Sequence, residues 1–177
     1  MKNSCVRYID LIETFNKKTP SIDSTAYVHP SAVIIGEVTI KANCSVWPFA
    51  VIRGDVEPIF IDEGTNIQDH AMIHASSGYP VTVGKHVTIG HHAIIHGATI
   101  HDEVLVGMDS VVLDGCIINK HCLIGAKALV TSHSKIKERS LVLGSPAKVI
   151  CDLSLTQVKS ILDNADEYIQ LKEKAKE

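Results

Sequence analysis

The chain has 177 residues, of which 45% are hydrophobic and only 5% are aromatic, and its formal net charge is −3. This length suits one domain that buries its core without disulfide or metal staples, and the scarcity of aromatic side chains favours a core of thin, repeated layers. The sequence has no cluster of lysine and arginine and no apolar run of about 18 residues, so we expect a cytoplasmic protein with no nucleic-acid partner and no membrane partner.

Residues 1–27 carry no repeat and differ in this from the rest of the chain. We expect them to form a capping segment that covers one end of the repeat region. The apolar side chains expected to do this are Tyr8, Ile9, Leu11, Ile12 and Phe15.

A six-residue period follows. Its fifth position, which includes Val56 and Ser77, never holds a residue larger than valine. Three breaks interrupt the period, namely a three-residue insertion near Pro58, a four-residue insertion ending at Pro80, and a five-residue unit at Ile95. The first position is valine or isoleucine in all eighteen units: Val28, Ile34, Ile40, Val46, Ile52, Ile61, Ile67, Ile73, Val83, Ile89, Ile95, Ile100, Val106, Val112, Ile118, Ile124, Val130 and Ile136.

This pattern, with a large β-branched residue and a small residue pointing inward in each unit, predicts an all-β parallel β-helix of hexapeptide repeats over residues 28–150. Each unit supplies a short strand and a corner, and three units close a triangular coil, so eighteen units predict about six coils. Coils stacked about 4.8 Å apart give a prism about 29 Å long. Cys44, Cys116 and Cys122 fall on inward positions, and we expect buried thiols there rather than disulfides or ligands.

The C-terminal segment, residues 151–177, predicts an α-helix that Asp152 or Ser154 can cap. The helix either covers its own domain or takes part in a subunit contact, and the sequence leaves both interpretations open. Its apolar residues recur at helical spacing: Val158, Ile161, Leu162, Ala165, Tyr168 and Ile169.

Three histidines form the candidate metal site. His74 and His96 are both the second residue of their units and lie three units apart, so they should stack on neighbouring coils and converge on one ion. His91 is the third residue of its unit and should lie on a different face. A closed homotrimer would bring His91 of one chain to His74 and His96 of another, with an open position for water.

Polar residues surround this site in the same register. Arg53 belongs to the column of His74, and with Asp55 it could form an ion pair between subunits. Asp69 lies in the column of His91, and Gln68 beside it could hydrogen-bond a metal-bound water. Two more histidines, His70 and His92, adjoin the site. The remaining histidines are expected to be surface residues: His29, His86, His101, His121 and His133.

The motifs Arg53-Gly54-Asp55, Asn66-Ile67-Gln68-Asp69, His74 and Gly90-His91-His92-Ala93-Ile94-Ile95-His96-Gly97, in this order, resemble those of γ-class carbonic anhydrases. The resemblance covers residues 20–150 and implies a left-handed β-helix, a homotrimer and a divalent ion, zinc or else Fe2+ or Co2+. It also implies that His74, His91 and His96 are the ligands and that Gln68 bonds the metal-bound solvent, while Arg53, Asp55 and Asp69 order the interface and the site. The segment Gly144-Ser145-Pro146-Ala147-Lys148 is similar to the structural closure of many hexapeptide proteins.

The chain departs from the best-studied members of that class in its acidic residues. Val56 stands where they carry a glutamate, and the loop 76–80 has no acid, so proton transfer would fall to solvent or to His92. We expect a zinc-dependent lyase that hydrates CO2 to bicarbonate. The alternatives are a metal-dependent acyl-CoA thioesterase, a hexapeptide-repeat acyltransferase acting on an acyl thioester, and a metal-stabilised trimeric scaffold without activity.

Overall fold

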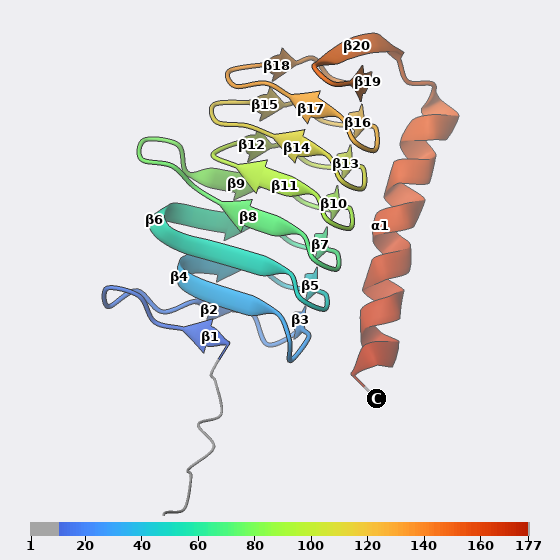
Figure 1. Cartoon of the computed structure of the whole chain (residues 1–177). Coiled ribbons are helices and arrows are strands. Elements are labelled where there is room, and N and C mark those ends of the chain that lie inside the picture. The colour runs from blue at the N-terminus through green and yellow to red at the C-terminus, as the bar shows by residue number, and fades with distance from the viewer. Residues whose placement is uncertain (1–10, 177) are drawn as a thin grey trace, which may run out of the picture.

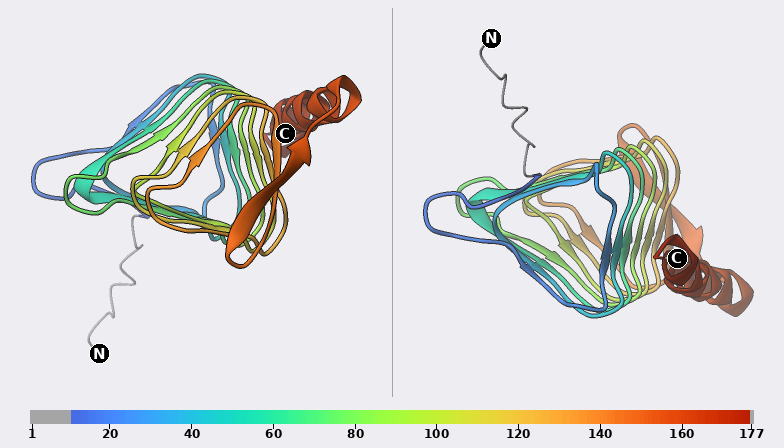
Figure 2. Two further views of the ribbon diagram at one scale, coloured as in Figure 1. Left: turned by 90° about the horizontal axis from the view of Figure 1, so that it is seen from above. Right: turned by 90° about the horizontal axis from the view of Figure 1, so that it is seen from below.

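The computed structural model describes residues 11–176, which form a parallel β-solenoid of about seven turns followed by one helix. Figure 1 shows the coils stacked one on another, and the views along the stack show their three-sided outline (Figure 2). The predicted fold class, a parallel β-helix of hexapeptide repeats with a C-terminal helix, is therefore confirmed.

Two sheets make up the three faces of the prism. The larger sheet bends around two faces because β6 pairs at once with β8 on one face and with β9 on the next. Its strands are β1 (Ile12–Glu13), β2 (Ser21–Ile22), β4 (Val33–Ile40), β6 (Val51–Ile61), β8 (Met72–His74), β9 (Val81–Val83), β11 (Ile94–His96), β12 (Thr99–Ile100), β14 (Val111–Val112), β15 (Ile117–Ile118), β17 (Leu129–Val130) and β18 (Lys135–Ile136). The third face consists of β3 (Tyr27–Val28), β5 (Ser45–Val46), β7 (Asn66–Ile67), β10 (Thr88–Ile89), β13 (Leu105–Val106), β16 (Leu123–Ile124), β19 (Ser140–Gly144) and β20 (Ala147–Asp152).

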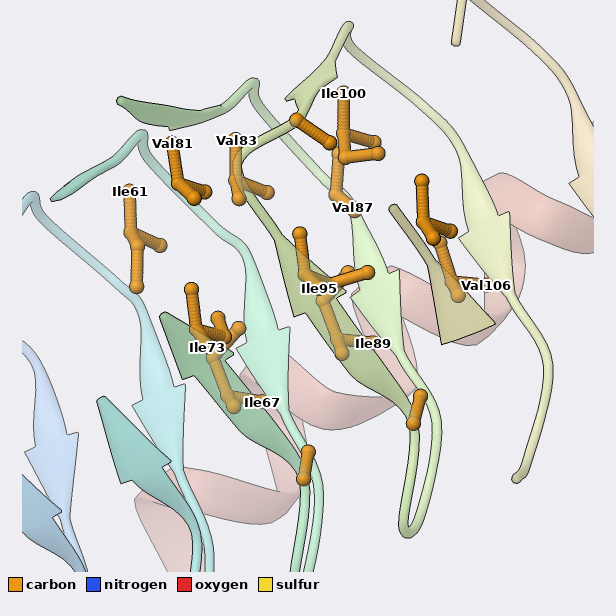
Figure 3. Packing of buried hydrophobic residues seen from close by; sticks show 14 of the residues in the cluster. Ile61, Ile67, Ile73, Val81, Val83, Val87, Ile89, Ile95, Ile100 and Val106 are labelled. Atoms are coloured by element: carbon orange, nitrogen blue, oxygen red, sulfur yellow. The ribbon is translucent and has the colours of Figure 1, made fainter. Parts of the chain in front are cut away.

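The core is a stack of branched side chains, one from each face per coil. Ile61, Ile67 and Ile73 point inward from one coil and are fully buried, as Figure 3 shows for this coil and its neighbours. Burying one such side chain contributes roughly 1.5–3 kcal/mol, and parallel pairing places identical positions directly over one another. The three cysteines predicted to be interior, Cys44, Cys116 and Cys122, are buried free thiols.

One corner of the prism departs from the predicted repeat. Val56 is 50% exposed and Ser77 is also exposed, so the expectation that both point inward is wrong. The insertions near Pro58 and Pro80 carry the chain outward at this corner. Ile59 and Val81 fill the inward position instead, because the strands pair Val38 with Ile59 and Ile59 with Val81.

The N-terminal part adds a coil that the sequence did not predict. Strands β1 and β2 both pair in parallel with β4, which brings the solenoid from six predicted turns to about seven. Ile12 and Phe15 are 40% and 48% exposed, so these two side chains do not cover the next coil as expected. Tyr8 and Ile9 lie outside the described residues.

At the other end, the segment 144–148 turns the chain back so that β20 pairs antiparallel with β19 and ends the solenoid. Ser154 then caps helix α1 (Leu155–Ala175) in a capping box with Gln157. The helix lies against the face formed by β5, β7 and β10 (Figure 1). Leu105, Leu123 and Leu141 of that face pack against Leu153, Val158 and Ile161, so the interpretation of α1 as a cover of its own domain is confirmed. No helix among residues 11–176 is long and apolar enough to cross a membrane.

Candidate metal centre

His74 and His96 stand on adjacent coils, as the repeat predicts. They end strands β8 and β11, whose register pairs His96 with His74, and Arg53 on β6 pairs with His74 from the other side. Side chains at paired positions of parallel strands point the same way, so the two imidazoles meet. Their ring centres are 5.1 Å apart, and Nδ1 of His74 lies 3.1 Å from Nε2 of His96.

His91 is kept apart from this pair. It follows β10, a strand of the other sheet, so it lies at a different part of the coil from β8 and β11. Within residues 11–176 of a single chain, no three histidine, cysteine, aspartate or glutamate side chains are grouped so that they could hold a metal ion. One chain therefore brings together two of the three expected ligands.

Each of the three histidines has a carboxylate on one ring nitrogen. The distances are 3.0 Å from His74 Nε2 to Asp55, 3.0 Å from His91 Nδ1 to Asp69, and 2.7 Å from His96 Nδ1 to Asp114. A carboxylate holds the hydrogen of a neutral imidazole on the nitrogen that it contacts and leaves a lone pair on the opposite nitrogen.

The ring nitrogens that do not contact a carboxylate, Nδ1 of His74 and Nε2 of His96, thus face each other at 3.1 Å. Two nitrogens bound to a tetrahedral zinc at about 2.0–2.1 Å are about 3.3 Å apart. This pair of side chains therefore has the donor atoms, the spacing and the outer carboxylates that a divalent ion requires. Nε2 of His91 is the ring nitrogen opposite the one that contacts Asp69, so it is open to a contact from outside the chain.

Asp55 joins Arg53 to His74. Its two carboxylate oxygens accept hydrogen bonds from the guanidinium of Arg53 and from Nε2 of His74. Burial works to raise the pKa of Asp55, but the hydrogen bonds from His74 and Arg53 outweigh it and hold this pKa below its ordinary value. The pair Arg53–Asp55 forms within one chain, which corrects the expected ion pair between subunits, because side chains two apart on a strand share one side of the sheet.

Gln68 is 5% exposed and is fixed at both ends of its amide. Its Oε1 accepts from the backbone N–H of His91 at 3.2 Å, and its Nε2 donates to Asn66 Oδ1 at 3.1 Å. Asn66 in turn donates to the hydroxyl of Thr88 at 2.9 Å. This row of donors and acceptors sets the direction of the Gln68 amide beside His91.

Asp114 is a site residue that sequence reasoning missed. It reaches His96 across Gly97, where a Cβ atom would lie 2.2 Å from the Asp114 carboxylate, and it also accepts a hydrogen bond from Ser76. The repeat does place Asp114 one coil beyond Gly97, and this position could have pointed to it. The repeat alone did not reveal that Gly97, having no side chain, leaves the space through which Asp114 reaches His96.

His92, the expected proton acceptor, lies at an exposed corner next to His91. Its ring packs against that of His70 in a tilted arrangement with centres 4.8 Å apart, and His70 stacks on Phe49. The loop 76–80 has no acidic residue of its own, but the side chain of Glu57 contacts it and accepts a hydrogen bond from the backbone N–H of Gly78 at 2.8 Å.

Comparison with known proteins agrees with this architecture. The model of the bacterial transferase hexapeptide family, described as six repeats, matches residues 97–132. A protein named probable carbonic anhydrase from Methanocaldococcus jannaschii is 48% identical over 86% of this chain and 96% of its own length. The carnitine operon protein CaiE of Escherichia coli is 36% identical over 89% of this chain and 80% of its own.

Two further proteins are similar to this chain over most of its length, and one of them is much longer than this chain. The gamma carbonic anhydrase 1, mitochondrial, of Arabidopsis thaliana is 36% identical over 93% of this chain, and this chain spans only 62% of that protein. The crystal structure of a hexapeptide transferase family protein from Anaplasma phagocytophilum is 36% identical, with a TM-score of 0.88 over 91% of this chain and 95% of that one.

The stacked coils and the match to the hexapeptide family show that this is a hexapeptide-repeat β-helix protein. Within that class, the chain belongs to the γ-carbonic anhydrase-like family, whose members include the Methanocaldococcus and CaiE proteins.

Proposed function

We propose that this protein is a homotrimeric metalloenzyme that interconverts CO2 and bicarbonate. One observation carries the proposal: Nδ1 of His74 and Nε2 of His96 converge at 3.1 Å, while carboxylates contact the other nitrogen of each ring. His91 of a neighbouring chain completes the ligand set, and zinc is the expected ion, with Fe2+ or Co2+ as alternatives. The carbonic anhydrases among the relatives support the reaction.

The trimer contact is proposed on the face that carries His74 and His96. Of the other two faces, one is covered by α1 and the other carries a mixed ladder that includes Thr82, Thr99 and Lys135. The His74 face instead presents an outward apolar ladder in which each residue pairs with the next, and an apolar ladder of this length is typical of a protein interface. Its members are Val33, Val51, Met72, Ile94, Val111 and Leu129.

The corner that holds His91 offers a complementary surface. Phe49 and Met108 are 57% and 55% exposed there, on either side of the His91 coil. A three-fold axis that sets this corner of one chain against the apolar ladder of the next places His91 towards His74 and His96. In this arrangement, the contact between two chains and the set of three histidine ligands form together.

The chemistry follows from this arrangement. A divalent ion at such a site acts as a Lewis acid that lowers the pKa of water to about 7 and so supplies a nucleophile at neutral pH. Asp55, Asp69 and Asp114 keep the three imidazoles oriented and increase their basicity. Gln68, held by Asn66 and by the N–H of His91, keeps its second amide hydrogen and second lone pair for solvent or substrate.

Proton release completes the cycle in the hydration direction. His92 lies next to His91 and is exposed, so its imidazole can take up the proton and pass it to buffer. Val56 offers no carboxylate for this task. We therefore expect hydration to respond to added imidazole buffer.

The test combines elemental analysis of the purified protein with two assays, stopped-flow CO2 hydration and hydrolysis of a panel of acyl-CoA thioesters. About one divalent ion per chain and hydration that vanishes on chelation would support the proposal. Thioester turnover without hydration would favour the acyl-transfer alternatives, for which the CaiE and transferase-family relatives are the support. Stoichiometric metal with neither activity would favour the trimeric scaffold.

A further inference from the structure

A small cavity lies on the helix-covered face, directly beside Gln68. Parallel pairing of β7, β10 and β13 puts Gln68, Gly90 and Gly107 at the same position of successive coils. A Cβ atom at Gly90 would lie 2.8 Å from the carbonyl oxygen of Val106, and one at Gly107 would lie 2.6 Å from the backbone nitrogen of Ala126. The close approach of the coils thus requires glycine at both positions, and the surface outside them is left hollow.

The walls of this cavity are mainly apolar. Leu105 and Met108 line it, and so do Thr88 and Asn164, where the Thr88 hydroxyl donates to Asn164 Oδ1 at 2.9 Å. Gln68 also lines the cavity and accepts a hydrogen bond from the backbone N–H of His91. None of the described side chains that line the cavity is charged.

The size of the cavity restricts what it can hold. Its volume is about 130 Å3. At roughly 30 Å3 for each water molecule, this equals about four waters, whereas sites for larger organic ligands measure about 300–1,000 Å3. A linear molecule of three heavy atoms fits this space, whereas an acyl chain with its pantetheine arm would extend beyond it.

We propose that this cavity is the pocket that receives CO2 before it is attacked. The inference rests on the proposed function and adds to it the place and the selectivity of the substrate. CO2 is small and uncharged and suits walls made by Leu105 and Met108, while the amide of Gln68 can bond one of its oxygens. Bicarbonate is an anion and finds no cation among the lining side chains, which favours its release.

The direct test is crystallography of the wild-type protein cooled under CO2 pressure, in parallel with a nitrogen-pressurised control. We expect linear density in the cavity between Gln68 and Leu105 only in the CO2 crystals. This measurement requires no hydration activity. Density in the cavity of a protein that fails to hydrate CO2 would thus refute the proposed function, and with it the role of the cavity in hydration, while showing that the cavity binds CO2.

Kinetics of two matched variants provide the second test. Leu105→Phe fills the cavity, whereas Leu123→Phe makes the same change one coil further on, where the leucine also packs under α1 but does not line the cavity. We expect kcat/KM for CO2 to fall at least about tenfold in the first variant, mainly through KM, and less than about twofold in the second. Metal content should stay the same in both.

Two results would overturn the pocket. The first is the absence of CO2 density from the wild-type cavity, whether or not the enzyme hydrates CO2. The second is an equal loss of kcat/KM in Leu105→Phe and Leu123→Phe, which would assign the effect to packing beneath α1. If Leu105→Phe does not fold, the pressurised wild-type crystals alone decide.

Discussion

The proposed contribution of His91 from a neighbouring chain predicts complementation between two inactive variants. The changes are His74→Ala and His91→Ala, each purified separately and each expected to lack bound metal. His74 and His96 meet on one face, whereas His91 follows a strand of the other sheet, and no chain groups the three within residues 11–176. Neither variant alone can therefore assemble a complete ligand set.

A mixed trimer can assemble one. In a closed three-fold ring, each interface joins the His74 side of one chain to the His91 side of the next, and random one-to-one mixing makes about a quarter of the interfaces intact. Equivalently, about three quarters of the trimers are mixed and each of these contains one intact site. After unfolding and co-refolding, bound zinc should recover to about 25% of the wild-type content, in line with that ring arithmetic.

The assay is elemental analysis of refolded trimers, with native mass spectrometry to verify that mixed species have formed. Each variant refolded alone is the control and should bind no stoichiometric zinc. If verified mixed trimers bind none either, then the three ligands do not come from two chains, and the proposed interfacial site is wrong.

Three further predictions concern single residues. Asp114→Asn should weaken zinc binding about 10–100-fold, measured by chelator competition, because the amide no longer accepts the His96 ring hydrogen in the same way. Ile95→Ala should lower the free energy of unfolding by about 2–5 kcal/mol in denaturant titrations, since the side chain is fully buried in the coil stack. Burial raises the pKa of the Cys44 thiol to about 11, so alkylation at pH 8 should be slower than for an ordinary thiol by more than about 100-fold.

Each of these has a matched control. Glu138→Gln is the control for Asp114→Asn, because it alters the contact of Glu138 with His121, a histidine far from the site, and should leave zinc affinity unchanged. If zinc affinity falls less than twofold in Asp114→Asn itself, Asp114 does not support the site. Ile150→Ala, at a side chain that is 57% exposed, should change stability by less than about 0.5 kcal/mol. Cys151 is exposed and should be alkylated first, and equally fast labelling of Cys44 by mass spectrometry would contradict its burial.

The sequence by itself determined the coil and the stacking of His74 on His96. In a solenoid each coil pairs only with its two neighbours, so residue counting carries the register from unit to unit. This is why His74 and His96 could be placed one above the other, and Arg53 beneath them, before the structure was known. The burial of Cys44 and Cys116 followed from the same count.

Only the tertiary structure decided what happens where the period breaks. At the two insertions, packing places Ile59 and Val81 inside and leaves Val56 in solvent, which depends on how far each loop leaves the coil. The extra N-terminal coil and the docking of α1 are likewise contacts between segments that share no repeat.

The same holds for the outer part of the site. The contact of Asp114 with His96 depends on the space left by Gly97, and the cavity beside Gln68 depends on Gly90 and on Asn164, which α1 brings to it. A periodic pattern specifies which residues share a column, because backbone pairing is regular. It does not specify which side chains bridge columns or close a pocket, because side-chain length and the path of the helix set those contacts.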